Sequence, residues 1–192
     1  MFTRCTLSLA LAAGLASGAA SAATYEIETH HTYPSLEMSH MGISVWRGKF
    51  NRSSGTVTYD RKAKTGTVDI KTETASIDFG HDEMNKHSVA EDWLNAAQFP
   101  TLDYKGKLVF KGKGDAPAEV DGQLTMRGVT KPLKLKINSF KCIDHPFYKK
   151  EVCGADAEGQ LDRADYGMTQ YTDNGMGKIL IRIQVEAIKQ SD

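Results

Sequence analysis

Histidine is the residue type in this chain with the widest chemistry, because imidazole binds transition metals and transfers protons near neutral pH. Adjacent strand residues face opposite ways, so His30 and His31 do not easily share one metal. His81 and His87 are six positions apart, not the three or four that align ligands on a helical face. We favour local hydrogen bonding as the role of the histidines. A metal-dependent enzyme using His30, His40, His81 or His87 is the alternative. The chain has six histidines: His30, His31, His40, His81, His87 and His145.

Arginine is the second residue type of interest, because a guanidinium group binds phosphate oxygens through paired hydrogen bonds. Arg163 lies in the acidic segment Asp162–Tyr166, where it either contacts the anionic head of a ligand or forms a structural ion pair. We favour the ion pair, and keep Arg163 and His40 as candidate head-group contacts. Gly128–Pro132 lacks the glycine spacing and the Lys-Ser/Thr ending of a phosphate loop, and no cofactor is expected.

The first residues of the chain have the pattern of a cleavable secretory signal. Arg4 precedes the apolar stretch Leu7–Leu15, and small residues follow up to Ala22. We therefore expect residues 1–22 to be removed and residues 23–192 to form one soluble, exported domain. No later apolar stretch approaches the roughly 20 residues of a membrane helix, so we do not expect a membrane-spanning protein. With 24 basic and 24 acidic residues, the charge balance gives no indication of nucleic-acid binding.

Two cysteines, Cys142 and Cys153, remain once Cys5 is removed with the signal. An even count is expected in an oxidising compartment, and we predict that the two are bonded. Closing the intervening loop would stabilise the fold by about 2.5 to 3 kcal/mol on the chain-entropy model. The alternative is a Cys/His metal site, but only His145 lies nearby and the paired ligand spacing of zinc modules is missing.

Apolar residues recur at every second position from Gly55 to Ala187, which is typical of antiparallel β-sheet. Many such strands joined by short turns indicate a sandwich or a closed barrel, and a closed barrel can hold a ligand inside. Residues 82–97 have the apolar spacing of a helix that Pro100 stops, and residues 166–177 read as a loop near the barrel mouth. The predicted strands cover residues 25–27, 35–38, 45–51, 55–60, 67–74, 76–79, 101–110, 119–126, 130–140, 154–163 and 178–189.

Alternate residues of a strand face opposite sides of a sheet, so odd- and even-numbered positions lie on different faces. This strand parity also predicts which side chains line the interior. A slip of one residue in register would invert any of these assignments. The candidate ligand-binding residues are Trp46, Phe50, Val57, Tyr59, Val68, Ile70, Leu102, Tyr104, Leu124, Met126, Leu135, Ile137, Ile181 and Ile183.

Four segments, whose order and spacing span nearly the whole mature chain, together resemble the YceI family of exported lipocalin-like proteins. The first segment, Ile27–Phe50, contains a histidine, a His-Met-Gly element and a Gly-x-Phe element. The last segment, Gly159–Met168, contains Asp-Arg-x-Asp-Tyr-Gly-Met. The other two segments are Trp93–Pro100 and Gly122–Leu133. The chain departs from the family pattern at two places. Met84–Ser88 keeps only the histidine of the family's Arg-Asp-x-His-Leu motif, and Trp93-Leu94 stands where the family has an aromatic pair.

The resemblance implies a mainly β fold: an extended eight-stranded antiparallel lipocalin-like barrel with one helical segment. It also implies a periplasmic, non-enzymatic binding protein, often a homodimer, that holds a polyprenyl phosphate, quinone or similar amphiphilic lipid in an apolar tunnel. The leading hypothesis is therefore an isoprenoid carrier. The alternatives are an interaction or stress protein with a filled barrel, and the histidine metal enzyme.

Overall fold

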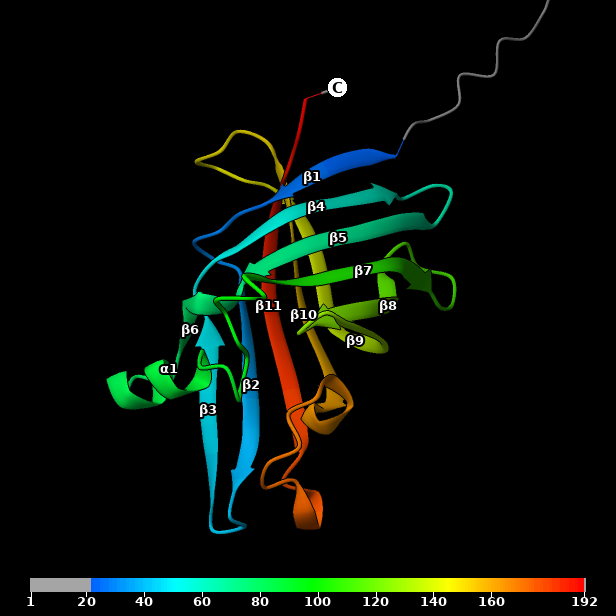
Figure 1. Ribbon diagram of the computed structural model, residues 1–192. Coiled ribbons are helices and arrows are strands. Elements are labelled where there is room, and N and C mark those ends of the chain that lie inside the picture. Colours follow the sequence, from blue (N-terminus) through cyan, green and yellow to red (C-terminus); the bar gives the residue numbers. More distant parts are fainter. Residues whose placement is uncertain (1–21, 192) are drawn as a thin grey trace, which may run out of the picture.

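One hydrogen-bonded sheet of eleven strands makes up most of residues 22–191, the part of the chain that the computed structural model describes (Figure 1). Eight of these strands form a closed ring, because β1 pairs with β4 on one side and β11 on the other. The predicted eight-stranded antiparallel barrel is therefore confirmed. In ring order the strands are β1 (Ala23–Ile27), β4 (Ser53–Asp60), β5 (Thr65–Glu73), β7 (Thr101–Phe110), β8 (Pro117–Met126), β9 (Val129–Asp144), β10 (Glu151–Asp162) and β11 (Lys178–Lys189). The predicted signal peptide, apart from Ala22, lies outside the described residues.

Three further strands, β2 (Tyr33–His40), β3 (Ser44–Phe50) and β6 (Ile77–Asp78), extend the sheet beyond the ring. The long strand β11 pairs with β1 near its C-terminal end and with β2 near its N-terminal end. The β2–β3 hairpin therefore runs down beside β11, away from the ring (Figure 1). Strand β3 pairs with β6 only at Lys49 and Phe50, so the rest of β3 pairs only with β2 among the described strands.

The helical segment is shorter than the predicted 82–97. Helix α1 spans Asp82–Ser88, and His81 caps its start by accepting a hydrogen bond from the Met84 backbone N–H. Residues after Ser88 form successive turns, and Asn95 takes a left-handed backbone conformation with φ of 50°, which a helix does not continue through. No helix within residues 22–191 combines the length and apolar character that a bilayer crossing requires. Between β10 and β11, residues 163–177 form turns that include the 3₁₀ segments η2 (Arg163–Tyr166) and η3 (Asp173–Gly175), so the predicted loop at 166–177 starts at the end of η2.

Apolar and polar residues alternate along the strands of the barrel wall. In β9 a β-bulge shifts this alternation by one residue. Ala157 of β10 pairs with Ile137, whereas Ala155 pairs with Phe140, so β9 carries one extra residue between these pairs. A single inserted residue switches the face on which later side chains lie. Phe140 and Cys142 therefore share the face that Ile137 occupies before the bulge.

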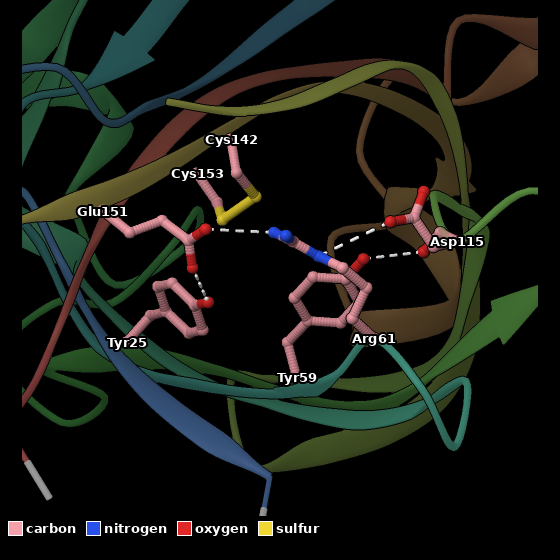
Figure 2. The surroundings of a disulfide bond; sticks show 7 residues. All are labelled: Tyr25, Tyr59, Arg61, Asp115, Cys142, Glu151 and Cys153. Atoms are coloured by element: carbon pink, nitrogen blue, oxygen red, sulfur yellow. Dashed lines mark hydrogen bonds and ion pairs between the residues drawn. A yellow bond between two sulfur atoms is a disulfide. The ribbon is translucent and has the colours of Figure 1, made fainter. Parts of the chain in front are cut away.

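The β9–β10 hairpin is longer than the sequence indicates, and it carries the predicted disulfide. The strands were expected to stop at Phe140 and to resume at Gly154, but pairing continues to Asp144 and Glu151. Cys142 and Cys153 are direct cross-strand partners and are bonded to each other (Figure 2). The cross-link therefore joins two paired strands rather than the ends of an open loop.

Candidate ligand-binding cavity

A cavity of about 250 Å³ lies inside the barrel. Its wall comes from all eight ring strands, from β2, β3 and β6, and from the segments that follow β6, α1 and β10. Within the described residues Arg163 is the single charged side chain in this wall, and no histidine, aspartate, glutamate or lysine lines it. The volume is slightly below the roughly 300–1,000 Å³ typical of small-molecule pockets. The space suits a slender apolar molecule.

The structure brings all but one of the candidate lining residues to this wall. The residues at the cavity are Phe50, Val57, Tyr59, Val68, Ile70, Leu102, Tyr104, Leu124, Met126, Leu135, Ile137, Ile181 and Ile183. The cavity wall also includes apolar residues that strand parity did not predict. Among them are Leu36, Met38, Phe79, Trp93, Leu94, Leu161 and Met168.

Trp46 and His40 are the two candidates that the structure does not bring to the cavity. Trp46 has the same parity as Phe50, but it lies on the part of β3 beyond the ring, where it packs against Phe79 with ring centroids 6.1 Å apart. His40 is exposed and lies against the Trp46 indole at 5.0 Å. Both side chains therefore belong to the outer β2–β3 hairpin, and His40 is not among the residues that line the cavity.

One end of the cavity, which we call the tyrosine end, is closed by Tyr25 and Tyr59 next to the disulfide (Figure 2). The Tyr25 hydroxyl donates to the Glu151 carboxylate at 2.5 Å, and the Tyr59 hydroxyl donates to the Asp115 carbonyl at 2.7 Å. Arg61 lies between the two acids, 3.1 Å from Glu151 and 3.4 Å from the Asp115 carboxylate. Burial, together with the hydrogen bond to Glu151, raises the pKa of Tyr25 well above its ordinary value. Each hydroxyl at this end has its hydrogen-bond partner within the protein.

Aromatic packing fills the space around Tyr59 at the tyrosine end. The Phe110 ring stacks on Tyr59 at a centroid distance of 6.1 Å, and the Phe140 ring meets it edge-on at 5.4 Å. Such pairs contribute about 0.5–1.5 kcal/mol beyond the area they bury. Phe140 reaches this position because of the β9 bulge.

The opposite end of the cavity, the arginine end, is organised by Arg163 at the start of η2. Its side chain is 4% exposed. Its two terminal nitrogens donate to backbone carbonyls of the following loop: Met168 at 2.7 Å, Tyr171 at 3.0 Å, and Gln170. The structural ion pair favoured from the sequence is not formed, because the Asp162 carboxylate caps the Ala164 N–H instead. Burial lowers the pKa of Arg163, and the nearby Asp162 opposes this.

Trp93 completes the arginine end, and the sequence-based candidate list omits it. The Arg163 guanidinium lies over the Trp93 indole, with 4.9 Å between the guanidinium carbon and the ring centroid. Arg127 holds the backbone of this turn by donating to the carbonyls of Glu91 and Trp93. The sequence signal for Trp93 is the apolar spacing of residues 82–97, which predicts a helix and does not by itself indicate a cavity.

The histidines do not assemble into a common site. No group of three or more His, Cys, Asp or Glu residues with metal-binding geometry occurs between residues 22 and 191. The His31 Nδ1 lies 2.7 Å from the Glu28 carboxylate, and the His145 Nδ1 accepts from the Phe147 N–H at 3.3 Å. His87 packs against Trp93 with ring centroids 5.2 Å apart. The histidines thus make separate local contacts.

Comparison with known proteins places this architecture in a family. The sequence profile of the YceI-like domain matches residues 25–187. The chain belongs to the YceI-like family. Proteins named YceI from Salmonella arizonae and Salmonella enteritidis are each 32% identical over 177 residues, which cover 91% of this chain and 91% of each relative.

Solved structures share the YceI-like fold at lower sequence identity. BcnA from Burkholderia cenocepacia superposes with a TM-score of 0.66 at 17% identity, over 83% of this chain and 98% of that one. The YceI protein of Campylobacter jejuni gives 0.66 at 21% identity, covering 80% and 91% of the two chains. A domain from Saccharophagus degradans described as polyisoprenoid binding gives 0.61 at 10% identity, covering 88% and 99%. These likenesses establish the barrel fold.

Proposed function

We propose that this chain is a periplasmic carrier that holds one long-chain isoprenoid or a similar amphiphilic lipid in the barrel, without catalysing a reaction on it. The observation that carries this proposal is the closed barrel with an unfilled interior whose wall is mostly apolar and, among the described residues, carries one charged side chain, Arg163. The filled-barrel alternative requires an interior closed by its own side chains, and the cavity counts against it. The polyisoprenoid-binding description of the Saccharophagus degradans domain supports the choice of ligand class.

An apolar chain of about ten carbons gives only weak affinity by itself, about 4 kcal/mol or a millimolar dissociation constant at the lowest association cost. Each buried methylene contributes about 0.8 kcal/mol, so some ten carbons give about 8 kcal/mol before costs. Association removes roughly 4–15 kcal/mol, so affinity depends on how far the chain fills the cavity. Export to the periplasm is supported by the secretory pattern of residues 1–22 and by the disulfide, which persists in oxidising compartments.

Native mass spectrometry of protein purified from the periplasm tests this proposal. We expect a polypeptide mass that begins at Ala23 and carries one apolar adduct, which organic extraction releases as an isoprenoid-type chain. Protein that is repeatedly recovered empty, and that also ignores added polyprenyl lipids, would contradict the carrier function. The homodimer expected from the family resemblance stays a prediction, and sedimentation velocity of the same sample measures it.

A further inference from the structure

The tip of the β9–β10 hairpin carries apolar side chains in contact with solvent. Phe147 is 86% exposed, Ile143 44% and Tyr148 38%. The tip projects from the end of the barrel where β11 also ends, and it is the yellow loop in Figure 1. Single exposed apolar residues are common on proteins, but a group of them on one projecting turn is typical of an interaction surface.

Hydrogen bonds hold this turn in one shape. The His145 Nδ1 accepts from the backbone N–H groups of Phe147 at 3.3 Å and Tyr148 at 3.4 Å. The His145 carbonyl accepts from the Lys149 N–H at 2.9 Å. The disulfide joins the two strands before the turn begins. A turn fixed in this way has little conformational entropy to lose on binding.

Three lysines belong to the same hairpin and give its tip a positive charge. Lys141, Lys149 and Lys150 are all exposed. Within residues 22–191 none of the three forms an ion pair. Asp144 is the one acidic residue between Lys141 and Lys150 in the sequence. The basic residues of the tip therefore outnumber the acidic ones.

The acidic residues that adjoin the tip have partners of their own. Glu151 is bound at the tyrosine end by a hydrogen bond and an ion pair. Glu28 and Glu186 lie near Tyr148. The His31 Nδ1 is 2.7 Å from the Glu28 carboxylate and 4.0 Å from that of Glu186. These acids therefore do not form ion pairs with the three lysines.

An exposed phenylalanine beside lysines matches the interfacial layer of an anionic bilayer, where apolar rings lie among the head groups and ammonium groups lie near phosphates. The tip is a projecting turn, far smaller than the roughly 800 Å² that each partner of a stable protein complex buries. A fluid bilayer needs no complementary shape. The chain as a whole has 24 basic and 24 acidic residues, so attraction to an anionic surface has to come from a local group.

We propose that the β9–β10 tip docks reversibly on an anionic phospholipid bilayer, with Phe147 among the head groups and Lys141, Lys149 and Lys150 against lipid phosphates. The docked protein has the tyrosine end of its barrel toward the membrane. This inference goes beyond the proposed carrier function and does not depend on it, because none of these residues lines the cavity.

Vesicle sedimentation of the disulfide-bonded protein tests the docking. The vesicles are pure phosphatidylcholine, or phosphatidylcholine with about a quarter phosphatidylglycerol, so that the two differ in charge and neither contains an isoprenoid. Phe147→Ser removes the aromatic ring, and Ile43→Ser is its matched control, since Ile43 is 82% exposed on the other hairpin tip.

The charge is tested separately by the double variant Lys149→Gln, Lys150→Gln. Its matched control is Lys131→Gln, Lys134→Gln, which removes the same charge from exposed positions on the body of β9. A comparison of the two double variants separates a local effect of the tip from an effect of net charge.

We expect wild-type protein to bind the anionic vesicles at low ionic strength at least tenfold more strongly than the neutral ones, and to be released by high salt. Phe147→Ser should lower the partition coefficient about tenfold. The loss of Lys149 and Lys150 should lower it about 25-fold, at about fivefold for each lysine. Both controls should bind like wild type.

Three results would overturn the docking. One is wild-type protein that binds neither kind of vesicle. Another is equal binding to neutral and anionic vesicles. The third is a loss in the Ile43 or Lys131 and Lys134 controls as large as that in the tip variants. If vesicles are not bound and Phe147→Ser instead dissociates a dimer in sedimentation velocity, the tip contacts a second copy of the chain and not a bilayer.

Discussion

Filling the cavity from its own wall should expel the ligand without harming the fold, and Ala157 is the position for this change. Ala157 lies on β10, is 5% exposed and lines the cavity. Its cross-strand partners are Ile137 on β9 and Ile183 on β11, which also line the cavity. Replacing Ala157 with leucine places three more carbons into the space between these larger side chains.

The expected loss of affinity follows from the number of carbons displaced. If each added side-chain carbon excludes about one carbon of the bound chain, then three carbons at ~0.8 kcal/mol remove about 2.4 kcal/mol of binding free energy. That corresponds to a dissociation constant about 50-fold higher. The free energy of unfolding should not fall, because the added carbons enter unfilled space and are themselves buried.

Calorimetric titration with farnesyl-benzoquinone measures the affinity, and urea denaturation measures the fold. Gln160→Leu is the matched control, since it adds a leucine to the exposed face of the same strand. We expect wild-type affinity in the control and about 50-fold weaker binding in Ala157→Leu. A folded Ala157→Leu protein that binds as tightly as wild type would show that the ligand does not lie against β10.

Three further predictions concern stability. Serine at both Cys142 and Cys153 should lower the free energy of unfolding by about 2.8 kcal/mol, since the cross-link spans a separation of 11 residues; in urea denaturation, a loss below about 1 kcal/mol would contradict this. Gly122→Ala should cost about 1–3 kcal/mol, because a Cβ at this position would clash with both side-chain and backbone atoms of β7; an unchanged melting temperature would refute it. The hydrogen bond from Tyr25 holds the pKa of Glu151 below its ordinary 4.5, so this carboxylate stabilises the fold above that pH and loses the contribution as pH falls through the lowered value. Melting temperatures measured from about pH 6 to 3 should therefore fall less steeply for Glu151→Gln than for wild type, and parallel curves would exclude the effect.

Strand parity predicted most of the barrel wall because alternation is a local property of the sequence. The spacing of Ile181 and Ile183 places both side chains on one face of β11, and the structure shows that this face lines the cavity. Trp46 shows the limit of this reasoning. Its parity matches that of Phe50, but Trp46 lies on the part of β3 that does not pair with β6, and where such pairing stops depends on the partner strand rather than on the sequence of β3.

The features that alternation missed depend on contacts between distant segments. The β9 bulge after Ile137 exists because β10 pairs on both sides of it, so the inward position of Phe140 could not be derived from β9 alone. A helix does not continue to residue 97, since Asn95 adopts a left-handed conformation after a turn whose carbonyls Arg127 holds from another part of the chain. The contact of Trp93 with Arg163 was hidden for the same reason, as it joins two segments that are far apart in the sequence.

The central claim is that the barrel interior is a lipid site, and a crystal structure of the protein purified without added ligand tests it most directly. The account predicts continuous, elongated electron density inside the wall, starting beside Trp93 and extending toward Tyr59. A barrel whose interior is closed by its own side chains between these two residues would contradict it.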